Sequence, residues 1–284
     1  MAINFKDVAL SYDSKRKKVN FALKDINLEI SQRDDFITIV GKTGSGKSSL
    51  VSMFNALKYP TSGDAFIYGI KIKEKHPRKI KYNPIRKRIG LVFQFPDYQL
   101  FEETVLKDVM FGPMNFGLKE NEAKDEALKA LKLVGLKKEL YNKSPFELSG
   151  GEKKMASIAG ILSSDPEIFI LDEPTAGLDP FLRKELLELL TKLNKEYHKT
   201  IIIITHDMNI SYEYSKRTIV LKEGHIIYDG DSKELFTRHK DLALSASLML
   251  PDVVRITDEI NARCGLNLKY LDNIDLIYKE LKHE

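Results

Sequence analysis

The sequence predicts an α/β fold with a largely parallel central sheet, for three reasons. Continuous apolar runs at 36–41 (FITIVG), 167–172 (EIFILD) and 200–206 (TIIIITH) are typical of strands buried on both faces. The segment 180–196 between the last two is predicted to be helical and supplies the crossover that parallel strands require. A glycine-rich loop, GKTGSGKS at 41–48, follows the first run and precedes a helix pattern.

Short strands with turn signals surround this core. They are INFKDVALSY and FALKDINLEI near the N-terminus, then GDAFIYGIKI and RIGLVFQ, while RTIVLKEGHIIYDG predicts a hairpin that turns at Glu223–Gly224. We therefore expect a mixed central sheet with an N-terminal antiparallel β-subdomain. The segment 73–88 is rich in Lys, Arg and Pro and is interpreted as a solvated connector, with an arm that contacts phosphate or lipid as the alternative.

Helix patterns replace the strand signal from about residue 102 to 164, which predicts an inserted helical subdomain. One of its helices ends at Gly135 and has an apolar face made of Ala123, Ala127, Leu128, Leu131 and Val134. Beyond about residue 240 the chain is again helical but less regular. The expected division is therefore a main domain at 1–239, which contains the helical subdomain, and a small C-terminal helical extension at 240–284.

The composition fits a folded globular protein and narrows its class. The chain has 284 residues, of which 43% are hydrophobic, enough for a sizeable core. Lys and Arg number 45 against 41 for Asp and Glu, so nucleic-acid binding does not follow from charge. No run approaches the length of a membrane-spanning helix. The polar N-terminal segment and the single Cys264 favour a reducing cytosol.

The glycine-rich loop has the residues of a phosphate-binding loop. Its glycines let successive backbone N–H groups curl around phosphate oxygens, Lys47 places a positive charge near the β- and γ-phosphates, and the Ser48 hydroxyl is a Mg²⁺ ligand. The strand before it and the helix pattern after it distinguish this loop from a plain glycine-rich turn. The candidate nucleotide-binding residues here are Gly41, Lys42, Thr43, Gly44, Ser45, Gly46, Lys47, Ser48 and Ser49.

Polar residues at the ends of other apolar strands complete a candidate catalytic site. Asp172 can hold Mg²⁺ directly or through water, and the adjacent Glu173 can polarise the attacking water. His206 ends the next strand and belongs at the same edge of the sheet. Gln94 follows another strand, and its side-chain oxygen can reach Mg²⁺ or the water. Each of these residues alone could simply be a polar residue at a solvated strand end. Because a phosphate loop occurs in the same chain, roles in Mg²⁺ binding and in activation of the water are favoured.

A second helix start suited to an anion lies at 148–160, LSGGEKKMASIAG. Together with DEPTAGLD, these motifs in this order resemble the nucleotide-binding subunit of an ATP-binding cassette (ABC) transporter, a phosphate-loop NTPase, over about residues 3–235. In that family two subunits pack head to tail, and the signature of one closes over the ATP held by the other. The implied signature residues are Leu148, Ser149, Gly150, Gly151 and Glu152.

The same resemblance implies ATP and Mg²⁺ as ligands and Asp179 as a residue of the dimer loop. It also implies that Tyr12 stacks on adenine, with an ordinary core or surface aromatic as the alternative. The chain departs from the common signature at Glu152, where Gln is usual, and at the following Lys153, Lys154 and Met155. Glu152 adds negative charge close to a phosphate, which puts nucleotide affinity and turnover rate in question.

The segments FQFPDYQLFEETVLKDVMFGPMNFG and PFELSGGE are similar to those of the ATPase subunits of energy-coupling factor (ECF) importers of vitamins or transition-metal ions. This resemblance implies a second ATPase, identical or not, a transmembrane coupling subunit, a substrate-binding membrane subunit and no nucleic acid. It places the protein at the cytoplasmic face of the membrane, with the extension at 240–284 helping to join the ATPases. Asp97, Glu102 and Glu103 are interpreted as an acidic coupling groove, or else as ordinary surface carboxylates.

Three rival functions stay open at this point. The chain could serve another kind of ABC transporter. It could also be a soluble ABC protein of translation or DNA repair, although those proteins usually fuse two cassettes or insert a long coiled coil. A module that binds ATP without turnover is the third, and the presence of Glu173 and His206 argues against it.

Overall fold

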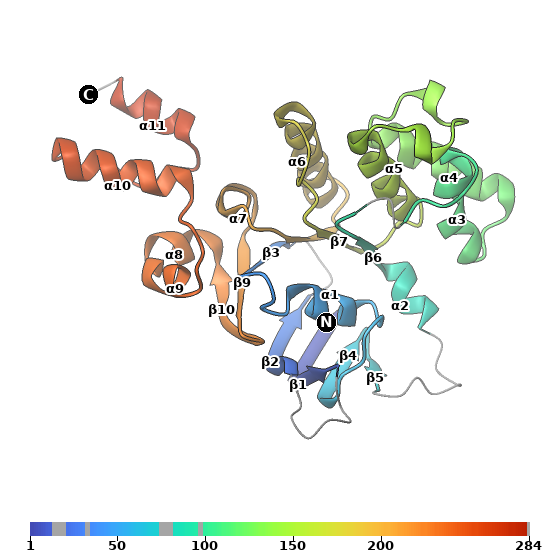
Figure 1. Cartoon of the computed structure of the whole chain (residues 1–284), viewed down its shortest axis with the longest axis horizontal. Coiled ribbons are helices and arrows are strands. Elements are labelled where there is room, and N and C mark those ends of the chain that lie inside the picture. The colour runs from blue at the N-terminus through green and yellow to red at the C-terminus, as the bar shows by residue number, and fades with distance from the viewer. Residues whose placement is uncertain (13–20, 32–34, 74–81, 96–98, 283–284) are drawn as a thin grey trace.

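The central sheet has six strands, five of them parallel, in the order β10-β9-β3-β8-β7-β6. The structure is a computed structural model that describes residues 1–12, 21–31, 35–73, 82–95 and 99–282 (Figure 1). The mixed sheet expected from the sequence is confirmed, with only β10 antiparallel. The strands are β3 (Phe36–Val40), β6 (Ile89–Val92), β7 (Ile168–Asp172), β8 (Thr200–Ile204), β9 (Arg217–Lys222) and β10 (His225–Asp231).

The apolar residues of these strands form continuous runs because the two faces of each strand pack against different cores. In β7, Ile168 and Ile170 enter one core cluster, whereas Phe169 and Leu171 enter another. Alternate side chains of a strand point to opposite faces, so a strand covered on both sides must be apolar at every position. This explains why period-two alternation is missing from these runs.

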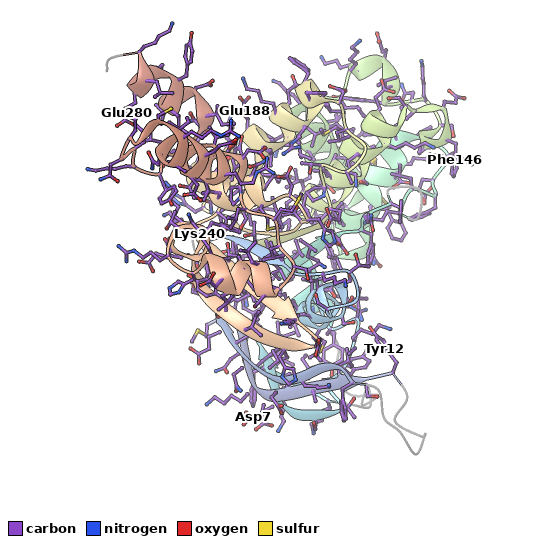
Figure 2. The ribbon with its side chains drawn as sticks, turned by 60° about the vertical axis from the view of Figure 1, so that its left-hand side comes forward. Asp7, Tyr12, Phe146, Glu188, Lys240 and Glu280 are labelled. Carbon is purple, nitrogen blue, oxygen red and sulfur yellow. The ribbon has the colours of Figure 1, made fainter. Side chains whose placement is uncertain are left out.

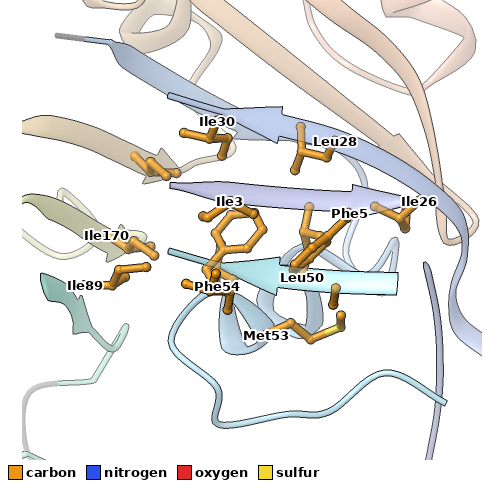
Figure 3. Close-up of a cluster of buried hydrophobic side chains, with 14 of the residues drawn as sticks. Ile3, Phe5, Ile26, Leu28, Ile30, Leu50, Met53, Phe54, Ile89 and Ile170 are labelled. Carbon is orange, nitrogen blue, oxygen red and sulfur yellow. The ribbon is translucent and has the colours of Figure 1, made fainter. Parts of the chain in front are cut away.

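The first core lies between the central sheet and a smaller antiparallel sheet of order β2-β1-β4-β5. Helix α1 (Lys47–Phe54) packs into it, and its Phe54 ring lies 5.7 Å from that of Phe5 (Figure 3). Ile89 and Ile170 reach the same cluster from the central sheet. The antiparallel strands are β1 (Ile3–Ser11), β2 (Phe21–Ile30), β4 (Ser62–Ile67) and β5 (Ile70–Ile72).

The second core joins the sheet to helices α3 (Val105–Asn115), α4 (Glu120–Leu133) and α5 (Gly150–Leu162), which adjoin the β6 edge (Figure 1). Two 3₁₀ turns, Lys138–Leu140 and Pro145–Glu147, link α4 to α5. The expected amphipathic helix is α4, and the crossover α6 (Pro180–Lys195) covers the same core. The extent of the helical subdomain, about 102–164, stays a proposal.

The connector predicted at 73–88 contains a short helix. Part of the predicted connector at 73–88 is helix α2 (Asn83–Arg88), because a proline stands in its first turn and Ile85 is buried in the first core. Residues 74–81 lie outside the described part, so the alternative of a phosphate- or lipid-contacting arm is not addressed.

Five further helices lie on the side of the sheet that carries β9 and β10 (Figure 1). They are α7 (Met208–Tyr214), α8 (Ser232–Thr237), α9 (Lys240–Ser245), α10 (Asp252–Cys264) and α11 (Ile274–Leu281). Helix α8 lies next to β10, and α7 lies against β3. A third core cluster contains Tyr212 and Phe236 as well as Val254 and Ile277, so the proposed extension shares a core with the main domain. No described helix combines the length and apolar character needed to cross a bilayer.

A buried cluster of hydroxyl groups links α7, β9 and α8 to β3, the strand before the glycine-rich loop. Thr38 Oγ1 of β3 lies 2.7 Å from Ser211 Oγ and 3.0 Å from Thr218 Oγ1. Thr218 Oγ1 lies 2.7 Å from Ser232 Oγ, which donates to Ser215 Oγ at 3.1 Å. Hydroxyl groups buried away from water need these partners, so the cluster holds α7, β9 and α8 in place on β3.

We predict that Thr38→Val lowers the free energy of unfolding by about 1–3 kcal/mol, because valine keeps the shape but leaves buried hydroxyl groups short of a partner. Urea unfolding followed by circular dichroism measures this. The control Thr237→Val removes a hydroxyl at an exposed hydrogen bond and should cost no more than about 0.5 kcal/mol. Equal losses in the two variants would contradict the role given to the cluster.

Candidate active site

The loop between β3 and α1 needs glycine at two positions. Gly41 has a φ of 148°, and a Cβ there would lie 2.2 Å from Leu221 O. Gly46 has a φ of 107°, and its Cβ would lie 2.6 Å from Ala22 O. Both the backbone angle and the close backbone neighbour exclude a side chain. The loop can therefore curl tightly at the N-terminus of α1, where helix N–H groups favour an anion.

Lys47 is buried within this loop and spans it. Its Nζ donates to Gly41 O at 2.7 Å and to Lys42 O at 3.1 Å. Burial lowers the pKa of Lys47, while the charges of Glu173 and Asp172 act in the opposite direction. The site thus sets an ammonium group inside the loop, opposite two carboxyl groups.

Ser48 and Asp172 form a pair of oxygen ligands suited to Mg²⁺. Ser48 Oγ donates to Asp172 Oδ2 at 3.0 Å, and burial raises the pKa of Asp172. Within the described ranges no cluster of three or more His, Cys, Asp or Glu forms a metal site. One hydroxyl and one carboxylate leave coordination positions for phosphate and water oxygens, the arrangement that Mg²⁺ prefers. The residues present therefore fit this ion beside a nucleotide.

Glu173 is held in a strained conformation next to His206. Its φ is 47°, in the left-handed region, and its N–H donates to Ile204 O at 2.9 Å. Its buried Oε1 has no hydrogen-bond partner among the described residues and lies 3.5 Å from His206 Nε2. Strain of this kind persists at functional sites.

Burial sets the protonation of this pair. It raises the pKa of Glu173, an effect that the His206 backbone N–H opposes and the Asp172 charge reinforces. Burial also lowers the pKa of His206, followed by the effect of the Lys47 charge. A carboxylate with a raised pKa is a better proton acceptor for water, and a neutral imidazole beside it can accept or donate one hydrogen bond.

These groups surround one cavity of about 620 Å³. Tyr12 lies at its edge and is 58% exposed; its hydroxyl is 2.7 Å from Ser49 Oγ, and Lys58 Nζ lies 4.9 Å from the centre of its ring. The sequence-predicted residues that the structure gathers around the cavity are Tyr12, Thr43, Gly44, Gly46, Lys47, Ser48, Ser49, Gln94, Asp172, Glu173 and His206. Gly41, Lys42 and Ser45 belong to the same loop but do not line it.

The signature residues Leu148–Glu152 and Asp179 do not line this cavity. Phe146, two residues before Leu148, lies well apart from Tyr12 (Figure 2). Asp179 caps α6, where its Oδ1 accepts from the N–H groups of Phe181 at 2.9 Å and Leu182 at 3.0 Å. The predicted anion site at Ser149 thus lies apart from the cavity formed by the phosphate loop of the same chain.

Glu152 accepts hydrogen bonds from Ser149, one of the implied signature residues. The Ser149 N–H and hydroxyl both donate to Glu152 Oε2 at 2.8 Å, and the Glu152 N–H donates to Ser149 Oγ at 3.3 Å. This reciprocal capping box lowers the pKa of Glu152 and begins α5. A phosphate that binds Ser149 must therefore displace this carboxylate or share the serine with it.

The expected acidic groove is only partly described. Glu103 pairs with Lys107 at 2.6 Å, which offsets its charge. The N–H groups of Phe101 and Glu102 donate to the buried carboxylate of Asp108 at 2.7 and 2.8 Å, which fixes the backbone there. Asp97 lies outside the described residues. The groove stays a prediction.

Sequence reasoning missed one buried charge near the cavity. Lys154 of α5 is 3% exposed, and its Nζ donates to Gln94 O at 2.6 Å. A signal was present: Lys154 stands four residues before the apolar Ile158, so both lie on the buried face of the helix.

The fold and the cavity define a phosphate-loop protein that binds a nucleoside triphosphate. A family model described as ABC transporter matches residues 23–176. The chain therefore belongs to the ABC transporter family of ATPases.

Similar proteins agree with this membership. Energy-coupling factor transporter ATP-binding protein EcfA2 of Geobacillus kaustophilus is 42% identical over 266 residues, covering 94% of this chain and 91% of its own. EcfA2 of Streptococcus agalactiae is 41% identical over the full length of both chains.

Solved structures are similar as well. CbiO1 of Clostridium perfringens, part of the ABC transporter complex CbiONQ, superposes with a TM-score of 0.73 at 38% identity. The match covers 90% of this chain and 98% of that one. The cassette MJ0796, a dimer bound to ADP and phosphate after hydrolysis, has a TM-score of 0.72 at 31% identity, covering 81% and 98%.

The raised pKa of Glu173 predicts an acid limb in the rate of ATP hydrolysis above the ordinary glutamate range. Glu173 accepts a proton only when ionised, so turnover must fall as the pH drops through its raised pKa. We expect kcat to be half-maximal on the acid side at a pH above 4.5, the ordinary value for glutamate. Rates at saturating Mg-ATP across the acid range check this, with circular dichroism to confirm that the protein stays folded. A half-maximal pH at or below 4.5 in folded protein would be inconsistent with Glu173 as the base.

Proposed function

We propose that this chain is the ATP-hydrolysing subunit of an ECF importer, in which closure of an ATPase dimer powers uptake of a vitamin or transition-metal ion. The observation that carries the proposal is similarity along the whole chain to proteins named as ECF transporter ATP-binding proteins. The cavity supports turnover as well as binding, because Glu173 and His206 stand beside the phosphate loop.

Different residues of the cavity bind the phosphates, bind Mg²⁺ and activate the attacking water. Backbone N–H groups of the loop at 41–48 and the Lys47 ammonium hold the β- and γ-phosphates. Ser48, Asp172 and Gln94 supply oxygen ligands for Mg²⁺, which offsets phosphate charge when bound. Glu173 accepts the proton of the attacking water. His206, whose Nε2 lies 3.5 Å from Glu173 Oε1, orients Glu173 toward the γ-phosphate.

The active form is a head-to-tail dimer. Ser149 and the N–H groups of Gly150 and Gly151 are separate from their own phosphate loop, so in this arrangement they complete the site of the partner. Asp179 lies near the signature because Gly151 packs closely on Leu182 of the same helix start, where a Cβ on this glycine would lie 2.5 Å from the leucine Cδ2. The dimeric form of a solved cassette supports this arrangement.

The membrane partners follow from the same proposal. A transmembrane coupling subunit docks in the groove after Gln94, and a separate membrane subunit binds the transported substrate. The chain then works at the cytoplasmic face of the membrane, with no role for nucleic acid. The extension at 240–284 joins the two ATPases, and its shared core with α7 and α8 would transmit that contact to the main domain.

We predict that Glu173→Gln retains ATP binding within about twofold but lowers kcat by about 10²- to 10⁴-fold, because it removes the proton acceptor and keeps the phosphate and Mg²⁺ ligands. Equilibrium binding and steady-state hydrolysis in the assembled transporter measure the two effects. The comparison variant Lys47→Ala should instead weaken ATP binding. Near-normal turnover of Glu173→Gln would reject the catalytic assignment.

A further inference from the structure

Lys154 is a buried cation that the proposed chemistry does not yet use. Its side chain is 3% exposed, on the first turns of α5 after Ser149. Lysine is almost never buried to this degree without a partner, because removing an ammonium from water is costly. The partner here is the backbone carbonyl of Gln94, at 2.6 Å from Nζ.

Two carboxylates lie within electrostatic reach of this ammonium. Burial lowers the pKa of Lys154, while the charges of Asp172 and then Glu173 act in the opposite direction. The same two carboxylates act on Lys47 from the phosphate loop. The charges of the acidic pair thus act on one ammonium from α1 and on one from α5.

The hydrogen bond of Lys154 joins two parts that both meet nucleotide in the proposed mechanism. Gln94 lines the cavity of its own chain, and Ser149 begins the helix that carries Lys154. A second contact between these parts is apolar and farther along α5, where a Cβ on Gly90 of β6 would lie 2.3 Å from Ile161 Cγ2. Gln94, the partner of Lys154, lines the cavity, whereas Gly90 and Ile161 do not.

We propose that Lys154 is a positioning residue that ties helix α5, which begins after Ser149, to the backbone at Gln94. Through this link the place of the Gln94 side chain in one ATP site and the orientation of Ser149 toward the other site are set together. The inference rests on the proposed function, since it concerns how that site is held. A hydrogen bond from a charged donor is strong enough for this, and its loss frees the backbone at Gln94 while the phosphate loop stays intact.

The first test compares kinetic constants of Lys154→Met with wild type in the assembled transporter. We expect ATP affinity within about twofold, kcat lower by about 10- to 100-fold, as for loss of a charged hydrogen bond, and a higher Mg²⁺ concentration for half-maximal rate. Lys154→Arg keeps the charge and the donor and should restore at least part of kcat. The matched control Lys124→Met replaces an exposed lysine on α4 and should change neither constant.

The second test asks whether Lys154 acts through Gln94. Gln94→Ala removes the side chain but keeps the carbonyl, so Lys154→Met should add little to the loss of kcat already caused by Gln94→Ala. If Lys154→Met does not fold, Lys154→Gln, which keeps a neutral donor, takes its place in the same cycle.

Two results would overturn the inference. One is a lower melting temperature of Lys154→Met with unchanged kcat and Mg²⁺ requirement, which means that the lysine is only structural. The other is full additivity with Gln94→Ala. Failure of the proposed function itself would look different, because wild-type protein would then hydrolyse no ATP.

Discussion

Parallel pairing of β3, β8 and β7 is the constraint on which the site depends. Asp172 pairs in register with Ile204, and Ile204 with Ile39 of β3. Because parallel strands end at the same edge of the sheet, the residues that follow these three must emerge together. The phosphate loop, Glu173 and His206 are those residues, so segments far apart in the sequence meet at one cavity. The two flanking cores make this register rigid, since a shift of one residue would exchange every side chain between them.

The same packing partly buries groups of opposite charge at the cavity. Asp172 and Glu173 have raised pKa values and Lys47 a lowered one, in each case mainly from burial. Such a site favours ligands that bring both signs of charge, as a nucleotide with Mg²⁺ does. The strained backbone of Glu173 fits this view, because the strand pairing holds it where it faces the cavity.

Much of the fold could be predicted because burial leaves a pattern in the sequence. Apolar runs indicated β3, β7 and β8, and helical spacing indicated α4. The short helix α2 was not predicted because Ile85 is its only buried apolar residue and its other contacts are made by arginines: Arg86 donates to Ala56 O and Arg88 pairs with Glu167. The motifs located the cavity residues, whereas the partner of Lys154 could not be predicted, because its bond to Gln94 O joins residues 60 positions apart. The capping box at Ser149 could have been predicted, since Ser149 and Glu152 have the Ser-x-x-Glu spacing of that motif.

The central claim is that the signature serves the ATP site of the other subunit, and dimers isolated through two different tags test it most directly. One dimer combines a Lys47→Ala copy with a Ser149→Arg copy; the other combines the double variant with wild type. If the partner is a distinct ATPase, the same arrangements are built across the two chains. We predict about half the wild-type rate in the first dimer, which keeps one intact site of two, and almost none in the second. The reverse pattern would show that the signature acts on its own chain and would contradict the account.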